Sequence, residues 1–178
     1  MAITKWIIDK AHSQIQFRVK HLMITTVTGG FSSFDASVET EGSDFMTAKI
    51  IFMAETASVS TGNDDRDAHI KSSDFFDVVT YPQIKFVITK LEKLNKENAY
   101  KMYGDLVIKN VSKNIGFDVE FTGMVKDPWG NNKAGFIISG KVDRRDFGLR
   151  WNVITEAGSI MVGEEARILC NVQLTEQK

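Results

Sequence analysis

The chain has 178 residues and a net charge of −1 at pH 7; 43% of its residues are hydrophobic and 25% are charged. These values are typical of a globular protein with a sizeable core, and we expect residues 1–178 to form a single domain. Because there is no basic run, the sequence gives no electrostatic reason to expect nucleic acid or an anionic membrane as a partner.

Alternating apolar and polar residues predict β-strands through most of the chain. The first clear strand covers residues 14–21, where every second side chain on one face is apolar. His21 falls in phase with the apolar side, which agrees either with a place in the core or rim or with contact to a ligand. Further along, Gly29 and Gly30 predict a turn or a bulge.

Residues 63–77 interrupt the strand pattern with acids, an Arg and a His, followed by two Phe residues. Asn63 is a suitable N-cap, and Asp64 and Asp65 in the first turn interact favourably with the helix dipole. We therefore predict a short helix over residues 64–72. An insertion of this kind in an all-β chain plugs or lines one end of a barrel.

The strand pattern resumes after this insertion and continues almost to the end of the chain. The predicted strands cover residues 14–21, 34–38, 48–53, 83–88, 99–109, 115–121, 134–142 and 166–174. Asn110 tolerates the left-handed backbone that a tight hairpin turn often needs. Eight strands joined mostly by hairpins, with one short helical insertion, favour an all-β fold, an eight-stranded antiparallel lipocalin-like barrel.

The sequence alone leaves open whether this barrel is filled by side chains or holds a ligand. Gly104, Ala134 and Gly140 share phase with large apolar residues, which suggests free space on the inward face. Tilted strands of about nine residues give a barrel height of roughly 20 Å, which suits an elongated lipid-like chain. Burial of each CH₂ of such a chain contributes about 0.8 kcal/mol. A cavity for an apolar ligand and a filled interior are both compatible with these observations.

The cysteine and histidine content argues against a disulfide or a metal site. Cys170 is the single cysteine and lies in an alternating run, so we interpret it as a buried structural thiol rather than a nucleophile. His12, His21 and His69 lack the spacing typical of metal ligands. We therefore expect no metal ion in this protein.

Arg66, Asp67 and His69 in the helical insertion invite several interpretations. His69 as acid or base, with Asp67 as its orienting group, would serve an enzyme that acts on a small amphiphile. Alternatively, Arg66 or His69 meets the polar head group of a lipid-like ligand at the mouth of the barrel. Because adjacent residues of a helix face different ways, we favour a structural ion-pair network that ties the helix to the barrel. The charges of residues 144–146 are expected in an exposed turn.

A set of short motifs occurs in one order along nearly the whole chain. They are Trp6–Asp9 with His12–Ser13, Phe17 and His21, Gly30–Phe31, Arg66–Ile70 with Phe75–Asp77, Tyr81–Pro82 with Phe86, Gly104–Leu106, Val111–Lys113, and Arg144 with Asp146–Gly148. In these motifs the chain resembles the YceI-like family of lipocalin-like, polyisoprenoid-binding proteins. The chain departs from the family pattern at Lys109–Asn110, where His-Gly is more frequent.

The resemblance implies an extended antiparallel barrel with an inserted helical segment. It also implies a long apolar pocket for isoprenoid-tailed molecules, such as quinones or polyprenyl phosphates, and often a homodimer. We therefore predict a non-enzymatic carrier or storage protein for a long isoprenoid or similar apolar lipid. It is expected to have no catalytic residues and no cofactor other than a bound isoprenoid or quinone-like lipid. An enzyme that acts on a small amphiphile, and a filled barrel that serves as a dimeric interaction module, are the alternatives.

The residues expected to bind the ligand lie on the inward face of the strands and in the helical insertion. They are Phe17, Val19, His21, Arg66, His69, Phe75, Ile84, Phe86, Leu106, Ile108, Phe117, Val119, Phe136 and Ile138. The inward phase of the strand residues comes from alternation, which a single β-bulge would invert locally.

The N-terminal residues 1–6 lack the basic segment and apolar stretch of a signal peptide. No apolar run approaches the roughly 20 residues that span a bilayer. We expect a cytoplasmic protein, or a periplasmic one if a leader has been removed.

Overall fold

The computed structural model describes residues 2–178, so Met1, the first residue of the N-terminal segment considered above, lies outside the described residues. The described chain contains the helix α1 (Asp64–Lys71) and eleven strand segments. The strands are β1 (Ile3–Ile8), β2 (Gln14–His21), β3 (Thr25–Phe31), β4 (Phe34–Glu41), β5 (Asp44–Glu55), β6 (Val59–Ser60), β7 (Gln83–Lys93), β8 (Ala99–Ile108), β9 (Val111–Lys126), β10 (Asn132–Asp143) and β11 (Val162–Glu176). Short 3₁₀ turns cover Lys10–His12, Thr56–Ser58 and Arg144–Phe147.

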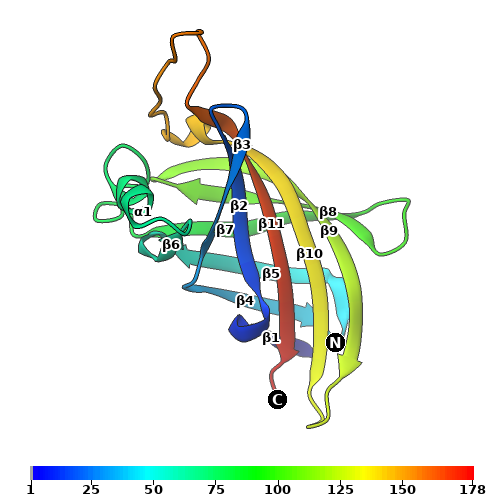
Figure 1. Cartoon of the computed structure of the whole chain (residues 1–178). Helices are drawn as coiled ribbons and strands as arrows, with labels where there is room; N and C mark the ends of the chain where they lie inside the picture. Colours follow the sequence, from blue (N-terminus) through cyan, green and yellow to red (C-terminus); the bar gives the residue numbers. More distant parts are fainter. Residues whose placement is uncertain (1) are drawn as a thin grey trace.

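The eleven segments form one closed antiparallel barrel of eight strands, which confirms the predicted fold class (Figure 1). Three of the eight strands are bent, since β1 continues into β2, β3 into β4, and β5 into β6. The long strand β11 closes the barrel, because its first part pairs with β2 and its last part with β1. Short β6 pairs with β3 on one side and contacts α1, so the helical insertion covers this end of the barrel.

The predicted turn or bulge at Gly29 and Gly30 is wrong, because both residues lie within β3, which pairs with β2 along its length without a register shift. A Cβ atom on Gly29 would lie 2.5 Å from the ring of Phe17. Glycine therefore serves here to let a strand approach a large aromatic side chain.

Strand β1 is also missing from the prediction. Its outward-facing residues include the apolar Ile3 and Ile7, so apolar side chains occur on both faces of the strand and the alternation is masked.

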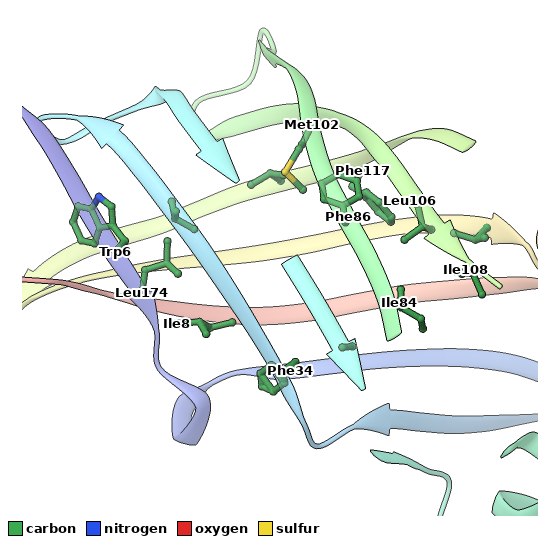
Figure 2. Close-up of a cluster of buried hydrophobic side chains, with 14 of the residues drawn as sticks. Trp6, Ile8, Phe34, Ile84, Phe86, Met102, Leu106, Ile108, Phe117 and Leu174 are labelled. Carbon is green, nitrogen blue, oxygen red and sulfur yellow. The ribbon is translucent and has the colours of Figure 1, made fainter. Parts of the chain in front are cut away.

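Large apolar side chains from strands far apart in sequence gather inside the barrel (Figure 2). The inference that Gly104 and Gly140 leave free space on the inward face is wrong. The rings of Phe86 and Phe117 cover these two glycines, and their own ring centroids lie 5.6 Å apart. Ala134 is completely buried. Cross-strand aromatic rings therefore fill the space that these small residues leave.

Two local predictions are confirmed. The Asn63 side chain caps α1 by accepting a hydrogen bond from the backbone N–H of Arg66 at 2.9 Å, and the helix ends at Lys71. Lys109 and Asn110 have φ angles of 52° and 61°, the left-handed backbone expected between β8 and β9. Among residues 2–178, no helix is both long enough and apolar enough to cross a membrane.

Candidate functional site

Two apolar cavities of about 510 Å³ each lie inside the barrel formed by residues 2–178. The first, which we call the hairpin-side chamber, extends to the β4–β5 hairpin. The second, the helix-side chamber, extends to α1 and to the loop of residues 148–161. Ile15, Phe52 and Cys170 line both cavities, and we call these three residues the waist. The two chambers therefore adjoin in the middle of the barrel.

The lining of the hairpin-side chamber is strongly apolar and aromatic. The ring of Phe45 lies 5.0 Å from that of Phe136 and 6.2 Å from that of Phe121, measured between centroids. Asp44 contributes its charge at the outer edge, in the β4–β5 hairpin. A lining of this kind favours hydrocarbon and offers few partners to a polar group.

The helix-side chamber is apolar inside and charged at its outer end. Its ionisable lining residues are Lys20, His21, Asp65, Arg66, His69 and Arg144. Lys20, Asp65 and Arg66 are exposed, and we call the outer end that they mark the mouth of the chamber. The Lys and Arg side chains outnumber the single Asp of the lining, so an anionic or hydrogen-bond-accepting group is favoured at this end.

The structure brings most of the predicted ligand-binding residues to these two cavities. In the lining of the helix-side chamber are Phe17, Val19, His21, Arg66, His69, Phe75, Ile84, Leu106 and Ile108. In the lining of the hairpin-side chamber are Phe86, Val119, Phe136 and Ile138. Phe117 lies outside both linings, because its ring packs against Phe86 and covers Gly140. Contact of any of these residues with a ligand stays a prediction.

The predicted ligand-binding residues include neither the waist nor Trp151, which belongs to the aromatic wall beside α1. Ile15 belongs to the same alternating run as Phe17, so the alternation could have predicted that its side chain also points into the barrel. Trp151 lies in a loop without periodicity, and its ring centroid is 4.5 Å from that of His69 and 5.5 Å from that of Phe75. Such a contact between a loop and the helical insertion leaves no pattern in the sequence.

The pairing of His69 with Asp67, on which the enzyme interpretation depends, does not form. Buried Asp67 accepts hydrogen bonds from the backbone N–H and the hydroxyl of Thr61, at 2.8 and 2.6 Å. The Nε2 atom of His69 lies instead 2.9 Å from a carboxylate oxygen of Asp74. This geometry orients the imidazole toward a partially exposed carboxylate and leaves Asp67 in a structural role.

The expected ion-pair network around Arg66 is wrong for the described residues, where Arg66 forms no salt bridge. Its Nε atom donates to the Thr61 hydroxyl at 2.7 Å, and its Nη2 atom donates to the Thr61 carbonyl at 2.8 Å. Thr61 directly follows β6, so hydrogen bonds rather than ion pairs fasten α1 to the barrel. The exposed guanidinium keeps further N–H groups that take part in neither of these two hydrogen bonds.

Arg144 is buried, which corrects the expectation of an exposed charge at this turn. Its guanidinium donates hydrogen bonds to four backbone carbonyls, those of Leu149, Trp151, Val162 and Gly163. Burial lowers the pKa of the Arg144 guanidinium. The neighbouring Arg145 is exposed, as expected, and pairs with Asp143 at 2.7 Å. Arg144 thus holds the loop of residues 148–161 in place and lines the chamber.

Cys170 is buried at the waist, and burial raises the pKa of its thiol to about 11. The thiol is therefore protonated at neutral pH and is a poor nucleophile, in agreement with a structural role. In the chain from residue 2 to residue 178, no cluster of three or more His, Cys, Asp or Glu side chains is arranged to hold a metal ion.

Comparison with known proteins covers nearly the whole chain. The family model described as YceI-like domain matches residues 6–174. A UPF0312 protein of Staphylococcus aureus (strain MSSA476) is 34% identical over 174 residues, which are 97% of this chain and 98% of the relative.

Solved structures show the same fold. The structure of a YCEI protein from Campylobacter jejuni is 33% identical, covers 96% of each chain and superposes with a TM-score of 0.76. A protein from Saccharophagus degradans, described as a polyisoprenoid binding domain, is 12% identical with a TM-score of 0.67 and covers 97% of this chain and 98% of that one. At 12% identity this likeness establishes the fold alone.

Proposed function

Because this chain belongs to the YceI-like domain family, we propose that its barrel binds the hydrocarbon part of a long isoprenoid or similar lipid, which the protein carries or stores. The observation that carries this proposal is the pair of apolar chambers that adjoin at Ile15, Phe52 and Cys170. An extended chain that crosses the waist would contact both linings. At about 0.8 kcal/mol per buried CH₂, such a chain binds tightly with few polar contacts.

The distribution of charge supports one orientation of the ligand. The mouth of the helix-side chamber presents Lys20 and Arg66, whereas the hairpin-side chamber is almost wholly apolar. We place the head group, a phosphate or a quinone, at the mouth, with the tail directed across the waist. The Arg66 guanidinium has N–H groups left after its bonds to Thr61, so it is suited to such a head group.

An enzymatic function receives less support from the site. His69 contacts Asp74, Phe75 and Trp151, and Asp67 is engaged by Thr61, so no acid–base pair faces the cavity through these two residues. The thiol of Cys170, with its pKa raised to about 11, is not an activated nucleophile. The proposed role is therefore retention and release of a lipid without covalent chemistry.

The proposal includes a homodimer. Ile7, Ile51 and Val87 are 46%, 56% and 43% exposed on the outside of the barrel. The strand register places Ile7 and Ile51 on either side of Ser37, and Val87 directly beside Ile51. An exposed apolar row of this kind is suited to contact with a second copy, and gel filtration with light scattering tests it.

A chain-length series tests the binding proposal. Isoprenoid alcohols of increasing length are titrated into protein stripped of lipid, and affinity should increase with each unit until both chambers are occupied. Ile15→Trp should narrow the waist, so long alcohols would bind this variant no better than short ones. Gln14→Trp, one residue earlier on the outer face of β2, is the matched control. Affinity that is independent of chain length in the unmodified protein would contradict the proposal.

A further inference from the structure

Five large apolar side chains are exposed at the end of the barrel that carries the helix-side chamber. Leu22, Met23 and Ile24 at the β2–β3 turn are 38%, 46% and 81% exposed, and Val153 and Ile154 in the loop of residues 148–161 are 46% and 75% exposed. We call these five residues the apolar lip. Both segments project from the same end of the barrel, away from the chain termini (Figure 1).

Backbone hydrogen bonds join the two parts of the lip into one surface. The N–H of Leu22 donates to the carbonyl of Met161 at 2.8 Å, and the N–H of Met161 donates to the carbonyl of Val153 at 2.9 Å. Met161 is therefore hydrogen-bonded through its backbone to Leu22 on one side and to Val153 on the other. Ile154 forms a β-bridge with Ile160, which keeps the tip of this loop folded.

The β2–β3 turn holds its apolar residues in an unfavourable backbone conformation. Leu22 and Met23 have φ angles of 51° and 60°, in the left-handed region that favours Gly and Asn. Their side chains are only partly buried, since Leu22 and Met23 keep 38% and 46% of their surface exposed. Large apolar residues at the tip of such a turn therefore add little to the stability of the isolated fold, and they fit a surface that contacts something outside it.

The lip borders the opening of the helix-side chamber. His21 and Met161 line the chamber; His21 directly precedes Leu22, and Met161 is hydrogen-bonded to Leu22 and to Val153. Lys20 and Arg150 are exposed and lie at the base of the two segments. At this position their charged groups can stay in a polar environment while the apolar side chains of the lip extend further out.

We propose that the apolar lip inserts into the surface of a lipid membrane and holds the mouth of the barrel against it. The lip consists of two projecting tips rather than a groove, which suits the interior of a bilayer better than a folded protein partner. It is continuous with the apolar wall of the chamber, so a lipid tail can pass from membrane to barrel along one apolar surface. This inference rests on the proposed function, since it assigns the route by which the lipid enters.

The experiment is flotation with vesicles of phosphatidylcholine and phosphatidylglycerol. The unmodified protein should float with the vesicles in both low and high salt, because apolar contact is not screened by ions. Ile24→Asp and Ile154→Asp should each reduce the bound fraction by roughly tenfold. Trp129→Asp is the control: Trp129 is 82% exposed in the β9–β10 loop, at the opposite end of the barrel, and its replacement should leave flotation unchanged.

Several results would overturn the proposal: no flotation of the unmodified protein, flotation that is unaffected by the two lip variants, loss in high salt, or loss with Trp129→Asp. A change of oligomeric state in Ile24→Asp would assign the lip to a second copy of the chain instead. Equilibrium loading with geranylgeraniol delivered from cyclodextrin separates the two proposals. Lip variants that load like the unmodified protein leave barrel binding intact, whereas failure of every form to load contradicts the proposed function itself.

Discussion

Cys170 provides a direct chemical test of whether a ligand crosses the waist. The residue is 7% exposed and lines both chambers, and burial raises the pKa of its thiol from 9.0 to about 11. A rise of two pKa units lowers the thiolate fraction at about pH 8 by roughly 100-fold, and the thiolate is the species that alkylating agents attack. The lipid-free native protein should therefore react about 100-fold more slowly than the denatured chain.

The assay follows iodoacetamide adduct formation on Cys170 by mass spectrometry, with lipid-free and lipid-loaded protein. In the lipid-free protein the rate should increase about tenfold per pH unit as the pH rises toward about 11. A hydrocarbon chain that crosses the waist should slow the reaction by a further factor of about ten or more by excluding the reagent. Equal rates in loaded and lipid-free protein would show that the bound chain does not reach the waist and would refute this reasoning.

Three further predictions concern stability. Gly104→Ala should destabilise the fold by about 1–3 kcal/mol in urea denaturation, because the new Cβ would lie 2.6 Å from Cε2 of Phe86 and 2.7 Å from the carbonyl of Val87; unchanged stability would contradict the close packing. Arg144→Ala should lower stability by about 3 kcal/mol, whereas Arg145→Ala, at the exposed neighbouring residue, should have a much smaller effect; equal effects would refute the structural role of Arg144. The raised pKa of Cys170 contributes stability that is fully present below the ordinary pKa of 9.0 and is lost as the pH rises through about 11. Cys170→Val should therefore reduce the alkaline loss of stability by about 2–3 kcal/mol, and identical pH profiles of the two proteins would contradict the assigned burial.

The fold could be predicted from the sequence because alternation reports directly which side of a strand is buried. The apolar patterns located β2, β4, β5 and the strands from β7 to β11, which gave the correct number of barrel strands. The prediction failed where a glycine makes room for a side chain on the neighbouring strand. Gly29 has the local signature of a turn, yet its missing side chain accommodates the ring of Phe17 on the paired strand.

The site was predictable along the strands and not in the connecting segments. Phase alone brought Phe17, Leu106 and Ile138 to the cavity walls. The contacts of His69 and the burial of Arg144 depend instead on segments without periodicity, residues 72–82 and 148–161. These two segments are held by hydrogen bonds and aromatic contacts, such as those of His69 with Asp74 and Trp151. Such contacts follow no periodic sequence pattern, so the sequence did not predict them.

Native mass spectrometry of gently purified protein, followed by solvent extraction, tests the central claim most directly. The account predicts a discrete added mass on the folded protein, and this mass should extract as an isoprenoid or a similar long apolar chain. Bare protein that is still bare after incubation with quinones and polyprenyl phosphates would contradict binding of such lipids in the two chambers.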